Sequence, residues 1–213
     1  MTSPNGIDWT SQTSASDNQW RSVTYGNALF VAVATSGTGN RVMTSTDGII
    51  WTSRTSAEDN DWRSVAYGNK TYVAVADTGV GNRVMTSPDG INWTSRTSAA
   101  DINWRGVTYG NGMFVAVAAS GPGNRVMTST DGDNWTSQTS VPNRGWQSVT
   151  FSGKTFVAVA AFGTPNRIMT SPDAIHWTLQ TTPAENAWSS VAYGANKFVA
   201  VATSGTGDRA MSG

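Results

Sequence analysis

The chain has 213 residues with 14 basic and 14 acidic side chains, so its formal net charge is zero. No overall field would therefore attract nucleic acid, and no apolar run is long enough for membrane insertion. Cysteine is absent, which excludes disulfides and thiolate chemistry, and no basic-then-apolar signal peptide opens the chain. Ten Trp, six Phe and 22 Gly indicate a turn-rich protein stabilised by aromatic packing.

One segment, Met43–Trp51, recurs almost unchanged every 42 residues. Its copies begin at Met1, Met43, Met85, Met127 and Met169, and Met211 begins a sixth. Five periods fill the chain almost completely. A fixed period of this length is typical of repeat architectures and predicts a single domain, 1–213, built from five equivalent units.

Within one unit the sequence predicts four short strands. Trp62–Tyr67 alternates and is followed by a tight turn at Gly68-Asn69, and Tyr72–Ala76 is almost wholly apolar. Arg83–Ser87 and Asn92–Thr97 flank a turn that contains Pro, Asp and Gly. No segment shows the 3.6-residue periodicity of an amphipathic helix.

Four antiparallel strands in about 40 residues are typical of a propeller blade, so the predicted fold is an all-β, five-bladed β-propeller. A solenoid would need atypical, polar terminal repeats, whereas the end repeats here resemble the middle ones. The expected third strand Asp208–Ser212 lacks a following partner. We therefore expect Ile7–Thr13 to serve as the fourth strand of that last blade and to close the ring.

A motif of the form Ser-x-Asp-Gly-x-x-Trp stands in the turn between the third and fourth predicted strands. The residues that carry it are Ser45, Asp47, Gly48, Trp51, Ser87, Asp89, Gly90, Trp93, Asp131, Trp135, Asp173 and Trp177. It resembles the Asp-box of sialidase-like (bacterial neuraminidase repeat) propellers, shortened by one residue between Asp and Gly. The first copy carries Asn5 for Asp, and the fifth carries Ala174 for Gly. The plan of five near-identical blades also resembles tachylectin-type lectins.

The resemblance implies that the box is a folding device, and it implies an extracellular or cell-surface location. An Asp side chain at a turn can accept hydrogen bonds from otherwise unpaired backbone N–H groups. The alternative is calcium binding by the same carboxylates, but only Asp131 has a second carboxylate, Asp133, close by in sequence. We therefore expect neither a metal nor a cofactor.

Because strand direction reverses at every turn, the tight turns share one face of the propeller and the longer loops share the other. The longer-loop face is the predicted binding face, as the resemblance to sialidase-like enzymes also implies. The candidate ligand-binding residues on it are Trp20, Trp62, Trp104, Trp146, Trp188, Asn40, Asn82, Asn124, Asn166, Arg41, Arg83, Arg125, Arg167, Arg209, Asp17, Asp59 and Asp101.

Two interpretations of these residues stay open. Indole faces beside amide and guanidinium donors suit a sugar ring and its hydroxyls. Alternatively, the Trp side chains fill the space between blades and the Arg side chains brace their own loops. The loops 141–145 and 182–186 differ from the earlier copies, so not all five sites would be alike.

Repetition argues against catalysis, which needs one asymmetric set of groups. Glu58 and Glu185 lie in different repeats, and the single histidine, His176, lies in a tight turn. We therefore expect no enzyme activity, and a sialidase-like hydrolase is the least favoured function. The first hypothesis is a multivalent glycan-binding module; the alternative is a structural or protein-interaction scaffold, of natural recent duplication or designed. The partner is thus a glycan or a protein, and a monomer is compatible with the sequence.

Overall fold

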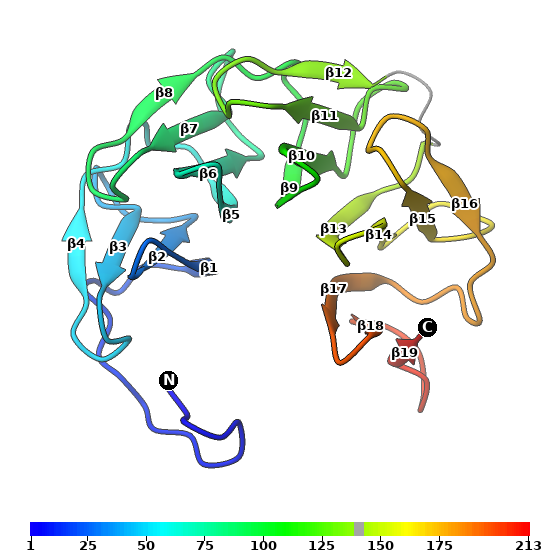
Figure 1. Cartoon of the computed structure of the whole chain (residues 1–213), viewed down its shortest axis with the longest axis horizontal. Coiled ribbons are helices and arrows are strands. Elements are labelled where there is room, and N and C mark those ends of the chain that lie inside the picture. Colours follow the sequence, from blue (N-terminus) through cyan, green and yellow to red (C-terminus); the bar gives the residue numbers. More distant parts are fainter. Residues whose placement is uncertain (139–142) are drawn as a thin grey trace.

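The computed structural model describes residues 1–138 and 143–213, and Figure 1 shows the blades arranged in an arc around a central axis. Blade 1 comprises β1 (Trp20–Gly26), β2 (Leu29–Ala34), β3 (Val42–Ser45) and β4 (Thr52–Arg54). Blade 2 comprises β5 (Trp62–Gly68), β6 (Thr71–Ala76), β7 (Val84–Ser87) and β8 (Thr94–Arg96). Blade 3 comprises β9 (Trp104–Gly110), β10 (Met113–Ala118), β11 (Val126–Ser129) and β12 (Thr136–Gln138). Blade 4 comprises β13 (Trp146–Phe151), β14 (Phe156–Ala160), β15 (Ile168–Ser171) and β16 (Thr178–Gln180). Blade 5 comprises β17 (Trp188–Gly194), β18 (Lys197–Ala202) and β19 (Ala210–Ser212).

Every blade is an antiparallel meander that runs from the inside of the arc to the outside. The first four blades have four strands each, and the fifth has the three strands β17-β18-β19. The described residues contain no helix. The all-β, five-bladed propeller predicted from the repeat is therefore confirmed.

The tight turns between the first and second strands follow from residues that tolerate positive φ. In blade 2 these residues are Asn69 and Lys70, with φ of 45° and 60°, and the strands pair from Gly68 opposite Thr71. The turn lies one residue later than the predicted Gly68-Asn69. Positive φ at both central positions gives a turn whose twist matches that of the flanking strands.

The second strands, such as β6, are the most deeply buried part of each blade. From Tyr72 to Ala76 every side chain in β6 is buried, because both faces of the strand are covered by neighbouring blades. This burial explains the continuous apolar run in the sequence, since a strand covered on both faces need not alternate.

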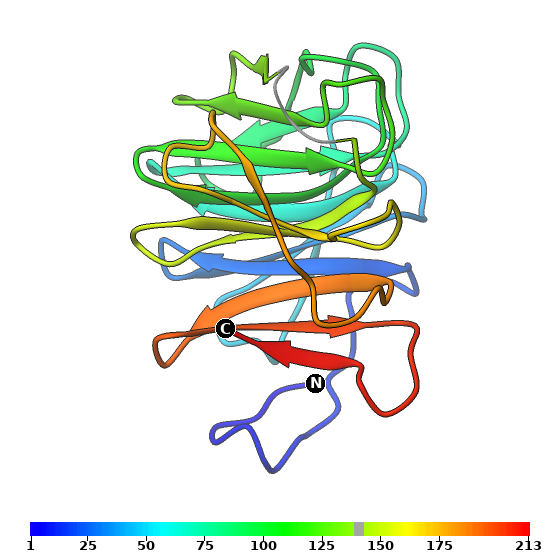
Figure 2. The ribbon, with the colours of Figure 1, turned by 90° about the vertical axis from the view of Figure 1, so that its right-hand side faces the viewer.

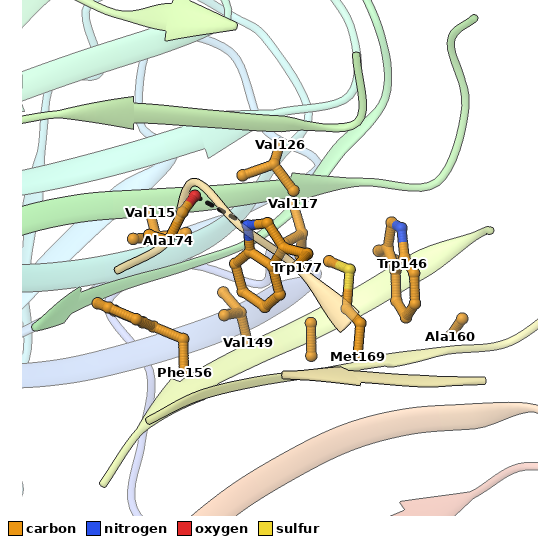
Figure 3. Packing of buried hydrophobic residues seen from close by; sticks show 11 residues of the cluster. Val115, Val117, Val126, Trp146, Val149, Phe156, Ala160, Met169, Ala174 and Trp177 are labelled. Atoms are coloured by element: carbon orange, nitrogen blue, oxygen red, sulfur yellow. Dashed lines mark hydrogen bonds between the residues drawn. The ribbon is translucent and has the colours of Figure 1, made fainter. Parts of the chain in front are cut away.

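Neighbouring blades are joined by two Trp side chains per repeat. The Trp that opens the first strand is fully buried in blades 2 to 5, as for Trp146. The Trp after the Asp turn reaches the preceding blade: Trp177 packs against Val115 and Val117 of blade 3 and against Phe156 of its own blade (Figure 3). Each blade therefore buries its apolar faces only against the blades beside it.

The first strands also contact one another directly along the axis. Ser22 Oγ accepts a hydrogen bond from the Val65 N–H at 3.2 Å, and Ser64 Oγ accepts one from Val107 at 3.1 Å. The Gly that ends a first strand gives room to the next blade's aromatic ring, since a Cβ on Gly26 would collide with Tyr67. These contacts set the angle between successive blades.

The expected closure by Ile7–Thr13 is wrong in this structure. The N-terminal segment forms its own hairpin, in which Thr2 and Thr10 exchange two backbone hydrogen bonds of 2.8 Å. Figure 1 and Figure 2 show this hairpin beyond blade 1, and the arc stays open between blades 1 and 5. One physical reason is that the segment pairs locally. Met1–Ser3 is a copy of the third strand, so Thr10 finds a local partner with little loop-closure cost and need not cross the gap.

The buried Trp side chains yield a first prediction. Trp104→Ala removes a fully buried indole from between two blades, so we expect it to lower the free energy of unfolding by about 3–5 kcal/mol. Chemical denaturation measures this. Val80→Ala, at a side chain that is 89% exposed, is the control and should unfold like the parent. Equal stability of the Trp104 variant and the control would contradict this packing.

Candidate functional site

The Asp turns (45–51 in blade 1 and its repeats) are held together by their own side chains. Asp47 Oδ1 accepts hydrogen bonds from the N–H groups of Ile49 and Ile50 at 2.8 and 2.9 Å. Ser45 Oγ accepts one from the Gly48 N–H, and Trp51 Nε1 donates to the Gly48 carbonyl. Because the Asp carboxylate accepts hydrogen bonds from the N–H groups of its own turn, it stabilises the fold. The relation to sialidase-like propellers stays a prediction.

Two irregular copies keep the same arrangement. In the N-terminal copy, Asn5 Oδ1 accepts from Ile7 and Asp8 at 2.9 Å. In blade 4, Ala174 takes the Gly position with φ of 63°, a conformation that costs an L residue some free energy. His176 Nδ1 lies 2.7 Å from Asp173 Oδ2 with a side chain that is 81% exposed, so it is a surface residue of the turn.

Hydrogen bonding holds these carboxylates ionised. Burial alone would raise the pKa of Asp89, but the Asn92 backbone and side chain, the Ile91 N–H and Ser87 together hold it well below its usual range. The Asn134 backbone and side chain lower the pKa of Asp131, and the His176 ring and backbone lower that of Asp173. The turns are therefore built around charged carboxylates.

Four of the five predicted Trp sites are wrong as ligand-stacking residues, and Trp20 stays a prediction. Trp62, Trp104, Trp146 and Trp188 have no exposed surface, and Trp20 is partly buried. Their indole N–H groups also point into the protein, as Trp62 Nε1 donates to the Glu58 carbonyl at 3.0 Å. A ring without a free face cannot stack on a sugar, so these side chains belong to the packing between blades.

The five arginines that precede the third strands brace their own loops. Arg83 is typical: its Nε donates to the Gly79 carbonyl and its Nη1 to the Asp77 carbonyl, both at 2.8 Å. The corresponding Nε contacts join Arg41 to Gly37, Arg125 to Gly121, Arg167 to Gly163 and Arg209 to Gly205. These guanidinium groups therefore stabilise the loops between the second and third strands.

Asp59 and Asp101 tie a loop to the segment that enters the next blade, whereas Asn82 is bound within its own blade. Asp59 Oδ1 accepts from the Gly39 N–H, and Asp101 Oδ1 accepts from Gly81, both at 2.7 Å. Asn60 Nδ2 donates to the Asn82 carbonyl at 2.8 Å. The equivalent residues Asn40, Asn124 and Asn166 lie in the same loops, and Asp17 is exposed at the open end of blade 1. In the loop 141–145, residues 141 and 142 lie outside the described part.

A second set of arginines, absent from the sequence-based prediction, meets at the inner rim of the longer-loop face. Each first strand has a β-bulge immediately after its Trp, and the extra residue is Arg21 in blade 1, Arg63 in blade 2 and Arg105 in blade 3. Bulges re-aim a side chain out of the regular pleat. Because the first strands pack side by side, the three arginines form what we call the arginine cluster.

One buried carboxylate lies at the centre of the arginine cluster. Asp77 Oδ2 accepts from Arg63 Nε at 2.8 Å and lies 3.1 Å from Arg105 Nη2, while the Asp77 side chain is 5% exposed. In blade 1 Thr35 replaces this Asp, so Arg21 hydrogen-bonds to Thr35 and Gln19 and stays exposed. The three guanidinium groups thus lie near one another, and among blades 1 to 3 only blade 2 has a carboxylate at the loop position of Asp77.

The arginine cluster contains polar atoms with unused hydrogen-bonding capacity. Among the described residues, neither Asp77 Oδ1 nor Arg105 Nε has a hydrogen-bond partner, although both atoms are buried. Burial lowers the pKa of Arg105, and Arg63 and Arg21 act in the same direction against the attraction of Asp77. An anionic group that approaches the exposed side of such a cluster can form charge-assisted hydrogen bonds with the guanidinium groups.

The cluster is confined to three blades. Gln147 and Ser189 occupy the bulge positions of blades 4 and 5, so the positive charge is asymmetric in an otherwise repetitive protein. In the sequence, the dipeptide Trp-Arg opens the first strand in the first three repeats and is absent from the last two, and this is the signal for the arginine cluster.

In residues 1–138 and 143–213, no group of three His, Cys, Asp or Glu side chains could hold a metal ion. The same residues include no helix long and apolar enough to cross a membrane.

This fold and its repeated blades define the protein as a β-propeller. The family described as the DUF6242 beta propeller domain matches residues 3–155, and the chain belongs to it. No curated protein sequence matches the chain.

Solved structures share the fold at low sequence identity. Virginiamycin B lyase of Staphylococcus aureus is 14% identical with a TM-score of 0.73; the match covers 87% of this chain and 64% of the lyase. A chain of a nidogen/laminin complex is 15% identical with a TM-score of 0.66, covering 87% of this chain and 72% of that one. YCF48 bound to D1 peptide is 17% identical with a TM-score of 0.59, covering 87% of this chain and 61% of that one.

The Asp turns yield a pH-dependent prediction. Asp89→Asn removes a charged acceptor, so we expect a loss of about 1 kcal/mol at neutral pH, discounted because the carboxylate is only partly buried. The folded pKa of Asp89 lies below the unfolded value near 3.9, so the charge contributes stability above that pH. This contribution disappears as the pH falls toward the folded pKa, and the parent and the variant should converge there. Thermal unfolding between pH 7 and pH 2 measures the difference, and a gap that does not narrow on acidification would contradict the assignment.

Proposed function

We propose that this propeller is a non-catalytic binding module that takes an acidic segment of a protein or peptide at the arginine cluster. The observation that carries the proposal is that Arg63 and Arg105 share the single carboxylate of Asp77, while the nearby Arg21 has no carboxylate partner in the described residues. The cluster lies at the inner rim of the longer-loop face, on the first strands rather than on the loops. A carboxylate on a partner would supply the negative charge that the rim lacks.

The exposure of the three arginines supports this role. Arg21 is exposed, and the side chains of Arg63 and Arg105 keep 22% and 29% of their surface. Arginine is suited to carboxylate recognition because its planar guanidinium can donate two parallel hydrogen bonds. The protein as a whole is neutral, so attraction of an acidic partner would depend on this local charge rather than on net charge.

Proteins of the same fold give additional support for a macromolecular partner. YCF48 is bound to D1 peptide in one solved structure, and another neighbour belongs to a nidogen/laminin complex. At this level of identity the likeness concerns the fold alone, so the binding chemistry proposed for this chain rests on its own arginines. Glycan binding is not favoured, because four of the five indole rings that would have stacked on sugars are buried.

The absence of catalysis is part of the proposal. Glu58 and Glu185 belong to different inter-blade loops, and Glu185 pairs with Arg167 at 3.2 Å. His176 pairs with Asp173 on the face of the tight turns, away from the arginine cluster. Within the described part of the chain, these groups therefore do not provide the pair of carboxyl groups across one substrate bond that glycoside hydrolysis by the usual route requires.

Binding of a fluorescent peptide rich in Asp and Glu tests the proposal. Arg21→Gln removes an exposed charge that makes no ion pair in the described part of the chain, so the fold should be kept. We expect this change to weaken binding roughly tenfold, and the double variant with Arg105→Gln to weaken it further. Fluorescence anisotropy at two salt concentrations measures both effects, since added salt should also weaken binding.

A matched control keeps this experiment specific. Lys154→Gln removes one exposed positive charge from a tight turn of blade 4 and should bind the peptide as the parent does. A peptide with Asn and Gln in place of the acidic residues should not bind. Equal weakening by Lys154→Gln and Arg21→Gln, or no binding of the acidic peptide to the parent, would reject the arginine cluster as the site.

A further inference from the structure

Asp77 shows how this fold places a carboxylate between the arginines of two successive blades. Its Oδ2 accepts a hydrogen bond from Nε of Arg63, in its own blade, at 2.8 Å and lies 3.1 Å from Nη2 of Arg105, in the next blade. The Asp77 backbone N–H donates to the Asp61 carbonyl at 3.2 Å, which fixes the loop against the start of the first strand. A carboxylate in this place offsets the repulsion between two guanidinium groups and forms charge-assisted hydrogen bonds with both.

One blade earlier, the equivalent position has no carboxylate. Thr35 occupies it, and the Thr35 backbone N–H donates to the Gln19 carbonyl at 3.0 Å, which is the counterpart of the bond made by Asp77. The first and second strands have the same register in both blades, with a β-bulge after the Trp in each. The two side chains therefore leave the backbone at equivalent places. We call the position beside Thr35, between Arg21 and Arg63, the carboxylate subsite.

Hydrogen-bond donors are available at the carboxylate subsite. Arg21 Nε donates to the Thr35 hydroxyl at 3.2 Å, where the equivalent Nε of Arg63 has a carboxylate at 2.8 Å. Within the described part of the chain, Arg63 uses only this Nε, so its two Nη groups make no hydrogen bond. A carboxylate placed as Asp77 is placed would accept from the Arg21 Nε and from an Nη group of Arg63.

The charges of the arginine cluster favour an added carboxylate. Burial lowers the pKa of Arg105, and the nearby charges of Arg63 and Arg21 lower it further, while Asp77 and, more weakly, Asp61 oppose the effect. The repulsion among these guanidinium groups thus extends across blades 1 to 3. Asp77 relieves it between blades 2 and 3, and no described carboxylate does so between blades 1 and 2.

The carboxylate subsite is accessible from outside the protein. Arg21 is exposed, Thr35 is partly buried, and the Arg63 side chain keeps 22% of its surface. The Asp77 side chain, by contrast, is only 5% exposed. The position in blade 2 is therefore filled by the fold itself, whereas the position in blade 1 can be filled by a partner.

The carboxylate subsite occurs once among the described blades. The residues at the position of Thr35 in blades 3, 4 and 5 all make the same backbone hydrogen bond, and they are Ala119, Ala161 and Thr203. The bulge positions of blades 4 and 5 carry Gln147 and Ser189, so none of these three residues lies between two arginines. Only the junction of blades 1 and 2 combines two arginines with an uncharged loop residue.

We propose that one Asp or Glu side chain of the partner binds at the carboxylate subsite, between Arg21 and Arg63, in the arrangement that Asp77 shows one blade further along. This inference rests on the proposed function and narrows it, because two of the three arginines contact the ligand and Arg105 stays paired with Asp77. The ligand carboxylate replaces the Thr35 hydroxyl as the acceptor for the Arg21 Nε.

Thr35→Asp tests the proposal by filling the carboxylate subsite from within the chain. We expect it to weaken binding of a fluorescent Asp- and Glu-rich peptide at least about tenfold, because the ligand loses its position and both of its partners. The peptide has an amidated C-terminus, so side chains supply all of its carboxylates. Fluorescence anisotropy measures the affinity.

Thr203→Asp is the matched control. It introduces the same charge at the same repeat position, but Thr203 is exposed and its blade carries Ser189 at the bulge. We expect this variant to bind the peptide as the parent does. The comparison separates occupation of the carboxylate subsite from a general repulsion between an acidic peptide and a more acidic protein.

Thermal unfolding without any peptide provides a second measurement. We expect Thr35→Asp to raise the midpoint at neutral pH by about 2–4 °C, because the new carboxylate joins two guanidinium groups, and we expect no rise for Thr203→Asp. In an Arg63→Gln background the gain should shrink, since Arg21 is then the only partner left. This cycle distinguishes a carboxylate shared between two blades from one paired with Arg21 alone.

The possible results separate this inference from the proposed function. A parent that binds no acidic peptide rejects the proposed function and the carboxylate subsite with it. If the parent binds but Thr35→Asp binds equally well, or Thr203→Asp weakens binding as much, the carboxylate subsite is overturned and the arginine cluster remains the binding site. A Thr35→Asp variant that is no more stable than the parent, or whose gain is unchanged by Arg63→Gln, also overturns it.

Discussion

The structure depends on burial between blades. A four-stranded blade has two apolar faces and cannot cover either of them alone, so each blade is stable only against its neighbours. Between the first four blades, the Trp that opens the first strand and the Trp that follows the Asp turn fill this space. In the interface around Trp177, the side chains of blades 3 and 4 surround the indole, and a hydrogen bond to Ala174 fixes its orientation. Burial of the indole N–H without a partner would cancel part of this gain.

The Asp turns and the loop arginines also stabilise the packing between blades. An ionised Asp47 satisfies the turn's N–H groups and so places Trp51 at the outer edge of its blade. On the other face, Arg83 and Asp101 connect one blade's loop to the next blade. Most polar residues that recur in every repeat are therefore committed to structure. Function is to be sought where the repeat is broken, because a recurrent residue has a recurrent structural partner.

Two breaks in the repeat distinguish this chain from a set of identical blades. The first is the change from Arg to Gln147 and Ser189 at the bulge position, which confines positive charge to three blades. The second is the open arc, which leaves each half of a blade interface exposed at opposite ends.

The sequence by itself determined the blade count, the strand order and the turns. These follow from local patterns: the period, the apolar run of each second strand and the Asp-Gly turns need no distant contacts to be recognised. The burial of Trp62 and its equivalents was one of two interpretations that composition left open, because a Trp at a strand end suits a core and a ligand site equally. Only the tertiary structure decided between them. It also decided the meeting of Arg21, Arg63 and Arg105, since a bulge redirects side chains by an amount that strand periodicity does not reveal. The expected ring closure was wrong for a similar reason. The repeat specifies which strand fits beside β19, but the angle set by four packed interfaces decides whether that strand can reach it.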